Sequence, residues 1–241
     1  MRTFVGYLAG DAVTTGSYNV AVGRSALGAN TTASSNISIG WNSLGDCVEG
    51  GKNIGIGHQS LRNLNPNSAS NTHNTAVGYH SGLNISTGTN NTILGSEAGD
   101  ALTTGSNNIV IGRSAAASAV DVSNEITLGD SNISAIRAQV TSISSLSDKR
   151  DKKDIKDSTY GLDFVDSLKP VTFEWDQRDG NRSGVKDVGF IAQDLQEVDD
   201  EYTRLVYESN PDKLEATYGR LIPIMAKAIQ ELSAEVKELK K

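Results

Sequence analysis

The segment from Thr141 to Lys156, with the sequence TSISSLSDKRDKKDIK, is the part of the chain whose residue types most suggest chemistry. A small, polar, uncharged run ends at Ser147, and a dense run of charges begins at Asp148. From composition alone, the favoured interpretation is structural. A solvated linker leads into a first helical turn, with Ser147 as its N-cap and acidic residues near its start.

Other reactive residue types are few. Cys47 is the single cysteine, which excludes a disulfide framework within one chain, and its simplest role is that of a small buried residue. The three histidines lack the spacing of metal ligands, so surface histidines are the favoured interpretation. They are His58, His73 and His80. We therefore expect no metal and no cofactor.

A repeat dominates the part of the chain that precedes this segment. Eight aliphatic-glycine steps lie 17 residues apart, except for one step of 21 that takes in Asn65–Ser68. A fixed period of this kind indicates a stack of similar rungs. The steps are Val5-Gly6, Val22-Gly23, Ile39-Gly40, Ile56-Gly57, Val77-Gly78, Leu94-Gly95, Ile111-Gly112 and Leu128-Gly129.

Each rung has the pattern Asn-φ-x-φ-Gly, where φ is a β-forming residue. It predicts a short strand with one apolar face, closed by a glycine that can adopt positive backbone φ. A small or apolar pair behind each turn, such as Ser43-Leu44, predicts a second, thinner inward face. The asparagines either form a hydrogen-bonded ladder or act only as turn formers. They are Asn19, Asn36, Asn53, Asn74, Asn91 and Asn108.

Composition changes abruptly after Ser147. Residues 1–147 hold 14 charged residues and 19 of the 24 glycines, whereas residues 148–241 hold 37 charged residues. This shift predicts a domain boundary. Both parts carry a net negative charge, which argues against a nucleic-acid partner. No stretch is apolar enough for membrane insertion.

Five ordered motifs in residues 147–241 resemble the self-cleaving intramolecular chaperone domain (peptidase S74-like) of phage tail fibres and tailspikes. The repeats more loosely resemble the rungs of trimeric adhesin heads, with a longer period here. The motifs are S-D-x-R-x-K-x-x-I at Ser147–Ile155, which includes Arg150; Gly161-Leu162; Leu168–Trp175; G-F-I-A-Q at Gly189, Phe190, Ile191, Ala192 and Gln193; and Tyr218-x-x-Leu221-Ile222-Pro223, followed by an amphipathic helix.

The resemblance implies single-turnover autoproteolysis by a Ser-Lys dyad. Ser147 would be the nucleophile and Lys152 the base, and the cut would fall between Ser147 and Asp148. A lysine acts as a base only where burial or a neighbouring cation lowers its pKa. The neighbouring Lys149 and Arg150 favour this, and the interspersed aspartates oppose it. Residues 148–241 contain no histidine, so the imidazole that many family members carry before the G-x-I-A-Q motif is absent.

The geometry of this reaction leaves two alternatives open. A serine hydroxyl that attacks its own carbonyl would close a strained four-membered ring, whereas attack on the Leu146 carbonyl would cut before the serine. Either the hydroxyl comes from a neighbouring subunit, or the cut lies one residue away from the position after Ser147.

The C-terminal helix, expected at about residues 217–241, carries apolar residues at alternating spacings of three and four. Such a seam predicts either a helix folded onto its own domain or a coiled coil. The chaperone resemblance favours a parallel three-stranded bundle. The seam residues are Ile222, Met225, Ile229, Leu232, Val236 and Leu239.

Together these features predict a homotrimeric phage tail-fibre or tailspike end. Residues 1–139 would form a mainly β repetitive shaft, a trimeric β-fibre or β-roll, and residues 140–147 a connector. Residues 148–241 would form a small α+β chaperone domain that ends in the trimeric helix, sets the register of three chains and is then released. Expected partners are other tail proteins and a host cell-surface receptor. The expected location is the virion, after assembly in the host cytoplasm.

Three alternatives remain. A bacterial trimeric adhesin would require a membrane anchor, and none is seen in this sequence. A depolymerase tailspike acting on surface polysaccharide would require paired carboxylates, for which Asp46 and Glu49 are neighbours, although turn solvation also explains them. A membrane-associated transcription regulator with the same domain would require a basic DNA-binding module, which this sequence lacks.

Overall fold

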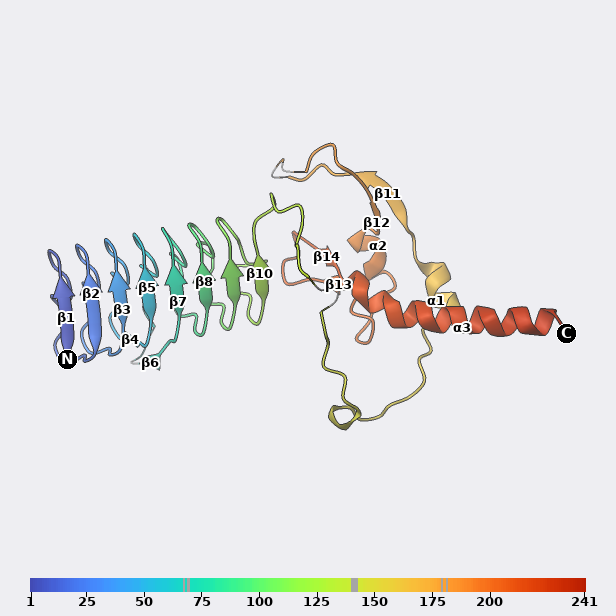
Figure 1. Cartoon of the computed structure of the whole chain (residues 1–241), viewed down its shortest axis with the longest axis horizontal. Helices are drawn as coiled ribbons and strands as arrows, with labels where there is room; N and C mark the ends of the chain where they lie inside the picture. The colour runs from blue at the N-terminus through green and yellow to red at the C-terminus, as the bar shows by residue number, and fades with distance from the viewer. Residues whose placement is uncertain (67, 69, 140–142, 179, 181) are drawn as a thin grey trace. The chain divides into compact units, whose positions relative to one another are not determined.

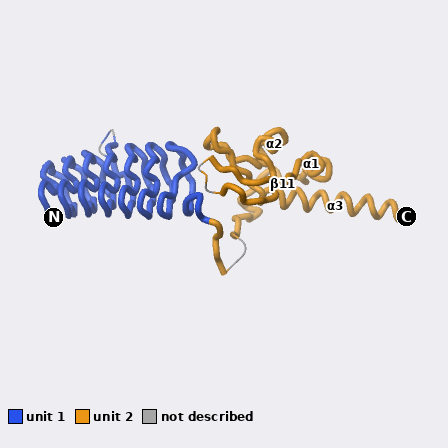
Figure 2. Tube along the Cα trace, turned by 90° about the horizontal axis from the view of Figure 1, so that it is seen from above, with its two compact units in different colours: residues 1–133 blue, residues 134–241 orange. Residues whose placement is uncertain are grey.

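The fold is taken from a computed structural model of the chain (Figure 1). It describes residues 1–66, 68, 70–139, 143–178, 180 and 182–241. These residues form two compact units, Met1–Ile133 and Ser134–Lys241 (Figure 2). Part of the predicted connector, residues 140–142, lies outside the described residues.

Unit 1 is a β-solenoid of about seven turns with rungs of about 17 residues, which confirms the predicted repetitive β architecture. Eight short parallel strands stack into one sheet in the order β1-β2-β3-β5-β7-β8-β9-β10 (Figure 1). They are β1 (Arg2–Val5), β2 (Asn19–Val22), β3 (Ile37–Ile39), β5 (Ile54–Ile56), β7 (Thr75–Val77), β8 (Thr92–Leu94), β9 (Ile109–Ile111) and β10 (Ile126–Leu128). A second parallel pair, β4 (Gly50–Gly51) and β6 (Ser70–Asn71), lies beside the longer step of the repeat.

The strand face that points into the solenoid is the opposite of the one expected. In β2, Asn19 and Ala21 are buried, whereas Val20 and Val22 are only partly buried. Side chains alternate along a strand, so burial of the asparagine carries the x residue of the pattern inward and turns the aliphatic positions outward. The buried x residues are Ala21, Ser38, Gly55, Ala76, Ile93 and Val110.

The predicted second inward face supplies much of the apolar core. Leu27, Leu44 and Leu61, each from the pair behind a turn, are fully buried and belong to one hydrophobic cluster with the inward alanines of the strands. Cys47 belongs to the same cluster, as expected for a small buried residue. Burial raises the pKa of its thiol to about 12. Each chain therefore encloses its own solenoid core.

The asparagines form a ladder that runs mainly from side chain to backbone. The Oδ1 atom of each accepts the backbone N–H of the asparagine one rung on, as from Asn36 to Asn19 at 2.9 Å and from Asn108 to Asn91 at 3.0 Å. Each Nδ2 donates to a backbone carbonyl, for example Asn91 to Gly105 at 2.9 Å. Glu125 ends the series of asparagines: its N–H donates to the Asn108 Oδ1 at 3.0 Å, and its carboxylate accepts the Ser118 N–H at 2.9 Å.

The glycine that ends each strand is required by the stacking distance. Gly57 has φ +134°, and a Cβ placed on it would lie 2.2 Å from the carbonyl oxygen of Gly78 in the next rung. No side chain fits such a gap, and the backbone conformation is itself unfavourable for other residues. The glycine column thus makes one corner of every rung tight and keeps the rungs in register.

Unit 2 is a small α+β fold. Its elements are the 3₁₀ helix η1 (Lys149–Asp151), α1 (Leu162–Ser167), β11 (Val171–Glu174), β12 (Lys186–Gly189), α2 (Ala192–Gln196), β13 (Val206–Tyr207), β14 (Glu215–Ala216), the 3₁₀ helix η2 (Tyr218–Arg220) and α3 (Leu221–Leu239). Strands β11 and β12 form an antiparallel pair, as do β13 and β14. The terminal helix confirms the predicted α+β region with a long helix at its end.

One stripe of α3 packs into the core of unit 2. Leu221 and Ile224 are buried with Leu195, Leu205 and Val206. Farther along the helix, the Glu231 carboxylate accepts the Leu162 N–H at 2.7 Å, where α1 begins without a side-chain cap of its own. Helix α3 therefore contacts both the core of unit 2 and the start of α1.

Candidate functional site

The charged segment after Ser147 folds into a single 3₁₀ turn, η1, whose N-cap is Asp148 and not Ser147, which corrects the cap expected from composition. The Asp148 carboxylate accepts the Arg150 backbone N–H at 2.8 Å and pairs with the Arg150 guanidinium at 2.7 Å. The side chain and then the N–H of Arg150 hold the pKa of Asp148 below its usual value. The carboxylate, being nearer to the turn, takes the capping role and leaves the serine hydroxyl for another partner.

The serine hydroxyl lies beside Lys152. The Lys152 Nζ is 2.5 Å from the Ser147 Oγ and 3.3 Å from the Ser147 carbonyl oxygen. The turn of η1 accounts for this contact, because it reverses the chain within the five residues that separate the two side chains. One amine thus contacts both a hydroxyl and the carbonyl of the following peptide bond.

Water surrounds this pair in the single chain. Ser147 and Lys152 are both exposed, as are all residues of η1. The guanidinium of Arg150, two residues before Lys152, forms an ion pair with Asp148. The chain alone therefore holds a hydroxyl and an amine together on an exposed part of the surface.

The G-F-I-A-Q motif is joined to the Y-x-x-L-I-P motif by one tyrosine. The Tyr218 hydroxyl accepts the Phe190 N–H at 3.1 Å, and the two rings meet edge to face at 5.7 Å. A Cβ on Gly189 would lie 2.6 Å from that hydroxyl, so glycine is needed for the approach. Ile191 then caps α2, which begins with Ala192 and Gln193 and buries Leu195. The motif therefore anchors the start of the terminal helix to the β-hairpin.

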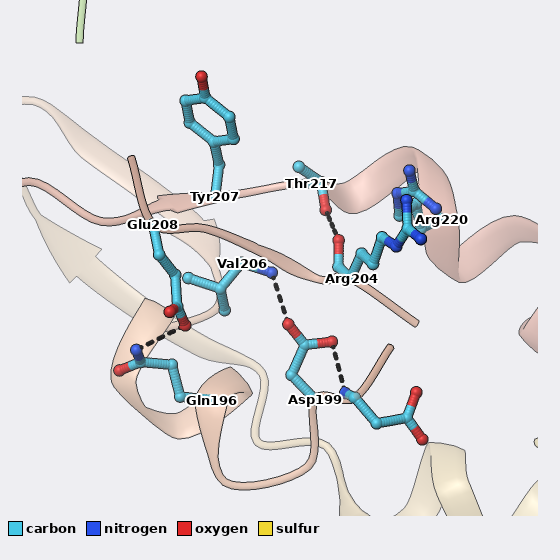
Figure 3. Close-up of a pocket in the computed structure, with 9 residues that line it drawn as sticks. Gln196, Asp199, Arg204, Val206, Tyr207, Glu208, Thr217 and Arg220 are labelled. Carbon is cyan, nitrogen blue, oxygen red and sulfur yellow. Dashed lines mark hydrogen bonds between the residues drawn. The ribbon is translucent and has the colours of Figure 1, made fainter. Parts of the chain in front are cut away.

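A pocket of about 610 Å³ lies elsewhere in unit 2, around the loop that leads into β13 (Figure 3). Asp199 organises it by accepting the N–H groups of Leu205 at 2.7 Å and Val206 at 3.0 Å. Partial burial raises the pKa of Asp199, but these bonds and that from Thr203 outweigh it and lower the pKa overall. Neither Ser147 nor Lys152 lines this pocket, so it is separate from the hydroxyl-amine pair.

The predicted seam of α3 is exposed on the single chain. Ile222, Met225 and Ile229 are all at least two-fifths open to solvent, and Leu232, Val236 and Leu239 continue the stripe. Because Leu221, Ile224 and Ala228 occupy the face that packs on the domain, the helix uses separate stripes for its own core and for the seam.

The outer face of the solenoid sheet is a second exposed apolar surface, which sequence reasoning missed. It consists of the outward aliphatic positions of the rungs, here called the outer sheet face. Val5, Leu94 and Leu128 are about half exposed, and Ile109, Ile111 and Ile126 lie on the same face. The alternation of side chains in the Asn-φ-x-φ-Gly pattern predicts this surface, because inward asparagines require the aliphatic φ positions to point outward.

The histidines lie in the solenoid, and two of them come together across rungs. The ring centroids of His58 and His80 are 5.4 Å apart. Within the described ranges, no group of three or more histidine, cysteine or acidic side chains is arranged to hold a metal ion. Asp46, named above as a possible carboxylate of a depolymerase, forms an ion pair with Arg62 at 3.6 Å.

Comparison with known proteins gives one family match. Residues 147–206 match the Peptidase S74 family model, described as Chaperone of endosialidase. No curated protein and no solved structure was found to match the chain. Among the described residues, no helix combines the length and the apolar character that crossing a membrane requires.

Proposed function

We propose that the chain is the distal part of a homotrimeric phage tail fibre or tailspike, because residues 147–206 match the Peptidase S74 family model and a β-solenoid precedes them. Residues 148–241 act as an intramolecular chaperone that drives trimerisation, and residues 1–139 are the shaft and contribute to host attachment. The observation that carries the proposal is the family match C-terminal to the stacked rungs. The chain works in the virion, after assembly with other tail proteins in the host cytoplasm.

The need for a chaperone follows from the repeat. Rungs with the same 17-residue pattern can pair with a neighbouring chain one rung out of register at almost no cost in free energy. A C-terminal trimer that forms first raises the local concentration of the shafts and aligns them. Its release then leaves a fibre that cannot unfold by the reverse route, so its stability is kinetic.

Two exposed apolar surfaces support the trimer. The seam of α3 is suited to a parallel three-stranded bundle. The outer sheet face belongs to an all-parallel sheet, a type that is ordinarily covered on both faces. Three solenoids that pack through this face would each keep the core they already enclose, which favours three separate β-rolls over an interwoven prism.

The pair Ser147 and Lys152 supports self-cleavage. Lys152 lies against the Ser147 carbonyl and so polarises the bond to Asp148. We assign the attack on that carbonyl to the Ser147 hydroxyl of a neighbouring chain, because a serine cannot reach its own carbonyl without a four-membered ring. A Lys152 amine takes the proton of the attacking Ser147 hydroxyl as the C–O bond forms. It gives that proton to the Asp148 nitrogen as the C–N bond breaks. Water then hydrolyses the ester and frees the serine.

Assembly would supply what the single chain lacks. Removal from water favours the neutral, basic form of a lysine, and the pair is exposed in one chain. Packing of three chains around this segment would remove that water and bring a second hydroxyl to each carbonyl. Cleavage would thereby wait for the trimer, so that the chaperone is not lost before it has acted.

Intact mass measurement tests the cleavage. Wild-type protein should yield fragments 1–147 and 148–241, and Ser147→Ala should stay full length. Lys152→Ala should block the cut, whereas the matched control Lys153→Ala should not. Full-length wild-type chain after complete folding would refute self-cleavage, and equal cleavage of both lysine variants would remove Lys152 from the dyad.

Mixed trimers separate the two routes of attack. Tagged Ser147→Ala chains would be co-expressed with untagged wild-type chains, so that the alanine chains retain a bond to Asp148 but have no hydroxyl of their own. Attack from a neighbouring chain predicts cut tagged chains. Tagged chains that stay intact, beside cut wild-type chains in the same trimers, would show that each serine acts within its own chain.

Light scattering tests the assembly. The Ser147→Ala protein should have about three times the 25.5 kDa chain mass, and a monomer at micromolar concentration would refute the trimer. Expression of residues 1–147 alone should give monomers or aggregates, whereas the same residues matured from the full chain should give a heat-resistant trimer. Identical resistant trimers from both sources would show that the C-terminal domain is not a chaperone.

A further inference from the structure

One corner of the solenoid gathers aromatic and basic side chains. It consists of the residues that directly follow the rung glycines, here called the ring corner. Since the glycine column fixes the rungs in register, these residues stack about 4.8 Å apart, the usual spacing of hydrogen-bonded strands. From the first rung to the fifth they are Tyr7, Arg24, Trp41, His58 and Tyr79.

The rings of the ring corner contact one another from rung to rung. Trp41 and His58 have ring centroids 4.5 Å apart, and His58 and Tyr79 have centroids 5.1 Å apart. His80 joins the cluster at 3.8 Å from Tyr79. Arg24 lies 6.0 Å from the Tyr7 ring, at the outer limit of a cation-π contact. The result is a stack of rings from Trp41 through His58 to Tyr79, with a separate contact between Arg24 and Tyr7 on the two preceding rungs.

This row is exposed and unusual for the unit. Of the five Phe, Tyr and Trp residues in residues 1–133, three stand at the ring corner. Trp41 is 42% exposed, Tyr79 45% and Tyr7 69%. Trp41 is tilted by 50° against His58, and part of its side chain stays open to solvent. Exposed tryptophan, tyrosine and arginine in one patch are the residue types that dominate binding energy in recognition surfaces.

The chemistry of the ring corner differs from that of the outer sheet face. The outer sheet face is aliphatic and suits a second copy of the chain. The ring corner combines flat apolar rings with a polar atom on each, namely the indole N–H, the imidazole nitrogens and the tyrosine hydroxyls. A sugar ring has the complementary character, because it carries an apolar C–H face and a rim of hydroxyl groups.

We propose that the ring corner binds a linear saccharide chain that runs along the solenoid axis with about one sugar ring per rung. The spacing of the rungs is close to the length of one pyranose unit in an extended glycan, so successive rings of the row can each meet a successive sugar. The guanidinium of Arg24 and the indole N–H of Trp41 supply donors to the hydroxyl or acidic groups of that chain. This inference rests on the proposed role of the shaft in host attachment and names the ligand class.

Trp41 provides a direct readout. The chain has two tryptophans, so Trp175→Phe leaves Trp41 as the only indole reporter. The full chain with this change would be titrated with a panel of purified linear bacterial capsular and O-chain polysaccharides. We expect at least one member to give a saturable change in Trp41 emission. Tyr79→Ala should weaken that affinity about tenfold, and Tyr79→Phe, which keeps the ring, by much less.

The matched control is Tyr18→Ala. Tyr18 is another exposed tyrosine of the solenoid, 71% open to solvent and outside the ring corner, so its loss should change the affinity less than about twofold. Panel members that all fail to bind, or that bind equally well after Tyr79→Ala, would overturn the inference. Each protein is first checked for cleavage and trimer mass. A cleaved trimer without saccharide binding refutes this inference alone, whereas an uncut monomer refutes the proposed function.

Discussion

Replacement of Asn53 by alanine removes a fully buried side chain that bonds in both directions along the solenoid. Its Oδ1 accepts the Asn74 N–H at 2.9 Å and the Thr72 hydroxyl at 2.8 Å. Its Nδ2 is shared between the Gly51 carbonyl at 3.1 Å and the Asn36 Oδ1 at 3.2 Å. Alanine can make none of these bonds.

The cost follows from which partners are left without a bond. The Asn74 N–H loses its acceptor in a buried place, which costs about 1–3 kcal/mol. The Thr72 hydroxyl keeps only a long contact to Gly51 at 3.5 Å, and the shared donor of Asn53 disappears, so two further bonds of about 1 kcal/mol each are lost. We therefore expect Asn53→Ala to lower the free energy of unfolding by about 3–5 kcal/mol per chain.

Guanidinium unfolding of the uncut Ser147→Ala protein, followed by circular dichroism, measures this loss. The midpoint should fall by about 1 M. The matched control is Asn63→Ala, because Asn63 also bonds to an asparagine of the next rung, Asn84 at 2.9 Å, but on the surface. It should cost less than about 0.5 kcal/mol. Should unfolding prove irreversible, the two unfolding rates are compared instead. Equal effects of the two substitutions would refute the assignment of solenoid stability to the buried ladder.

Three further outcomes are expected. Gly57→Ala should prevent folding or lower the free energy of unfolding by more than about 3 kcal/mol, because Gly57 has positive φ and the added Cβ would clash with the next rung. Gly28 does not have positive φ, so Gly28→Ala should be tolerated. The soluble yields of the two variants test this. The Leu162 N–H, and after it Lys227, hold the pKa of Glu231 below its usual value of 4.5. That contact therefore stabilises the domain fully above pH 4.5 and is lost as the pH falls through the lowered value, so Glu231→Gln should flatten the acid side of a melting-temperature profile. Finally, the cleavage rate in refolding chains should fall on dilution if the cut waits for the trimer, and a rate independent of concentration would contradict this coupling.

The sequence predicted the rung spacing, the glycine corner and the stripe of α3 because each depends on local geometry. A residue that must approach a neighbouring backbone can only be glycine, and Gly57 is recognisable for that reason alone. The apolar stripe was recognisable from its spacing, and its role as a trimer seam stays a prediction. Its exposure follows from Leu221 and Ile224, which occupy the other stripe.

The inward face of the strands was predicted wrongly for a physical reason. Valine and isoleucine ordinarily indicate the buried side of a strand, and asparagine the exposed side. Here Asn36 is buried because the adjacent rungs satisfy all of its hydrogen-bonding groups, and this reverses the alternation for Ile37 and Ile39. Likewise, Asp148 displaced Ser147 as the cap, since a choice between adjacent capping residues depends on the local turn.

The longer step of the repeat shows where the number of residues in a rung can change. Asn74 donates its N–H to Asn53 across 21 residues at 2.9 Å, a distance equal to that from Asn36 to Asn19 across 17. The strands β5 and β7 pair in parallel as the others do. Four extra residues have thus entered one rung without altering the ladder on either side. The corner near Pro66 is therefore a place where chain length can vary independently of the scaffold, which makes it a natural entry point for new surface loops and for peptide grafts.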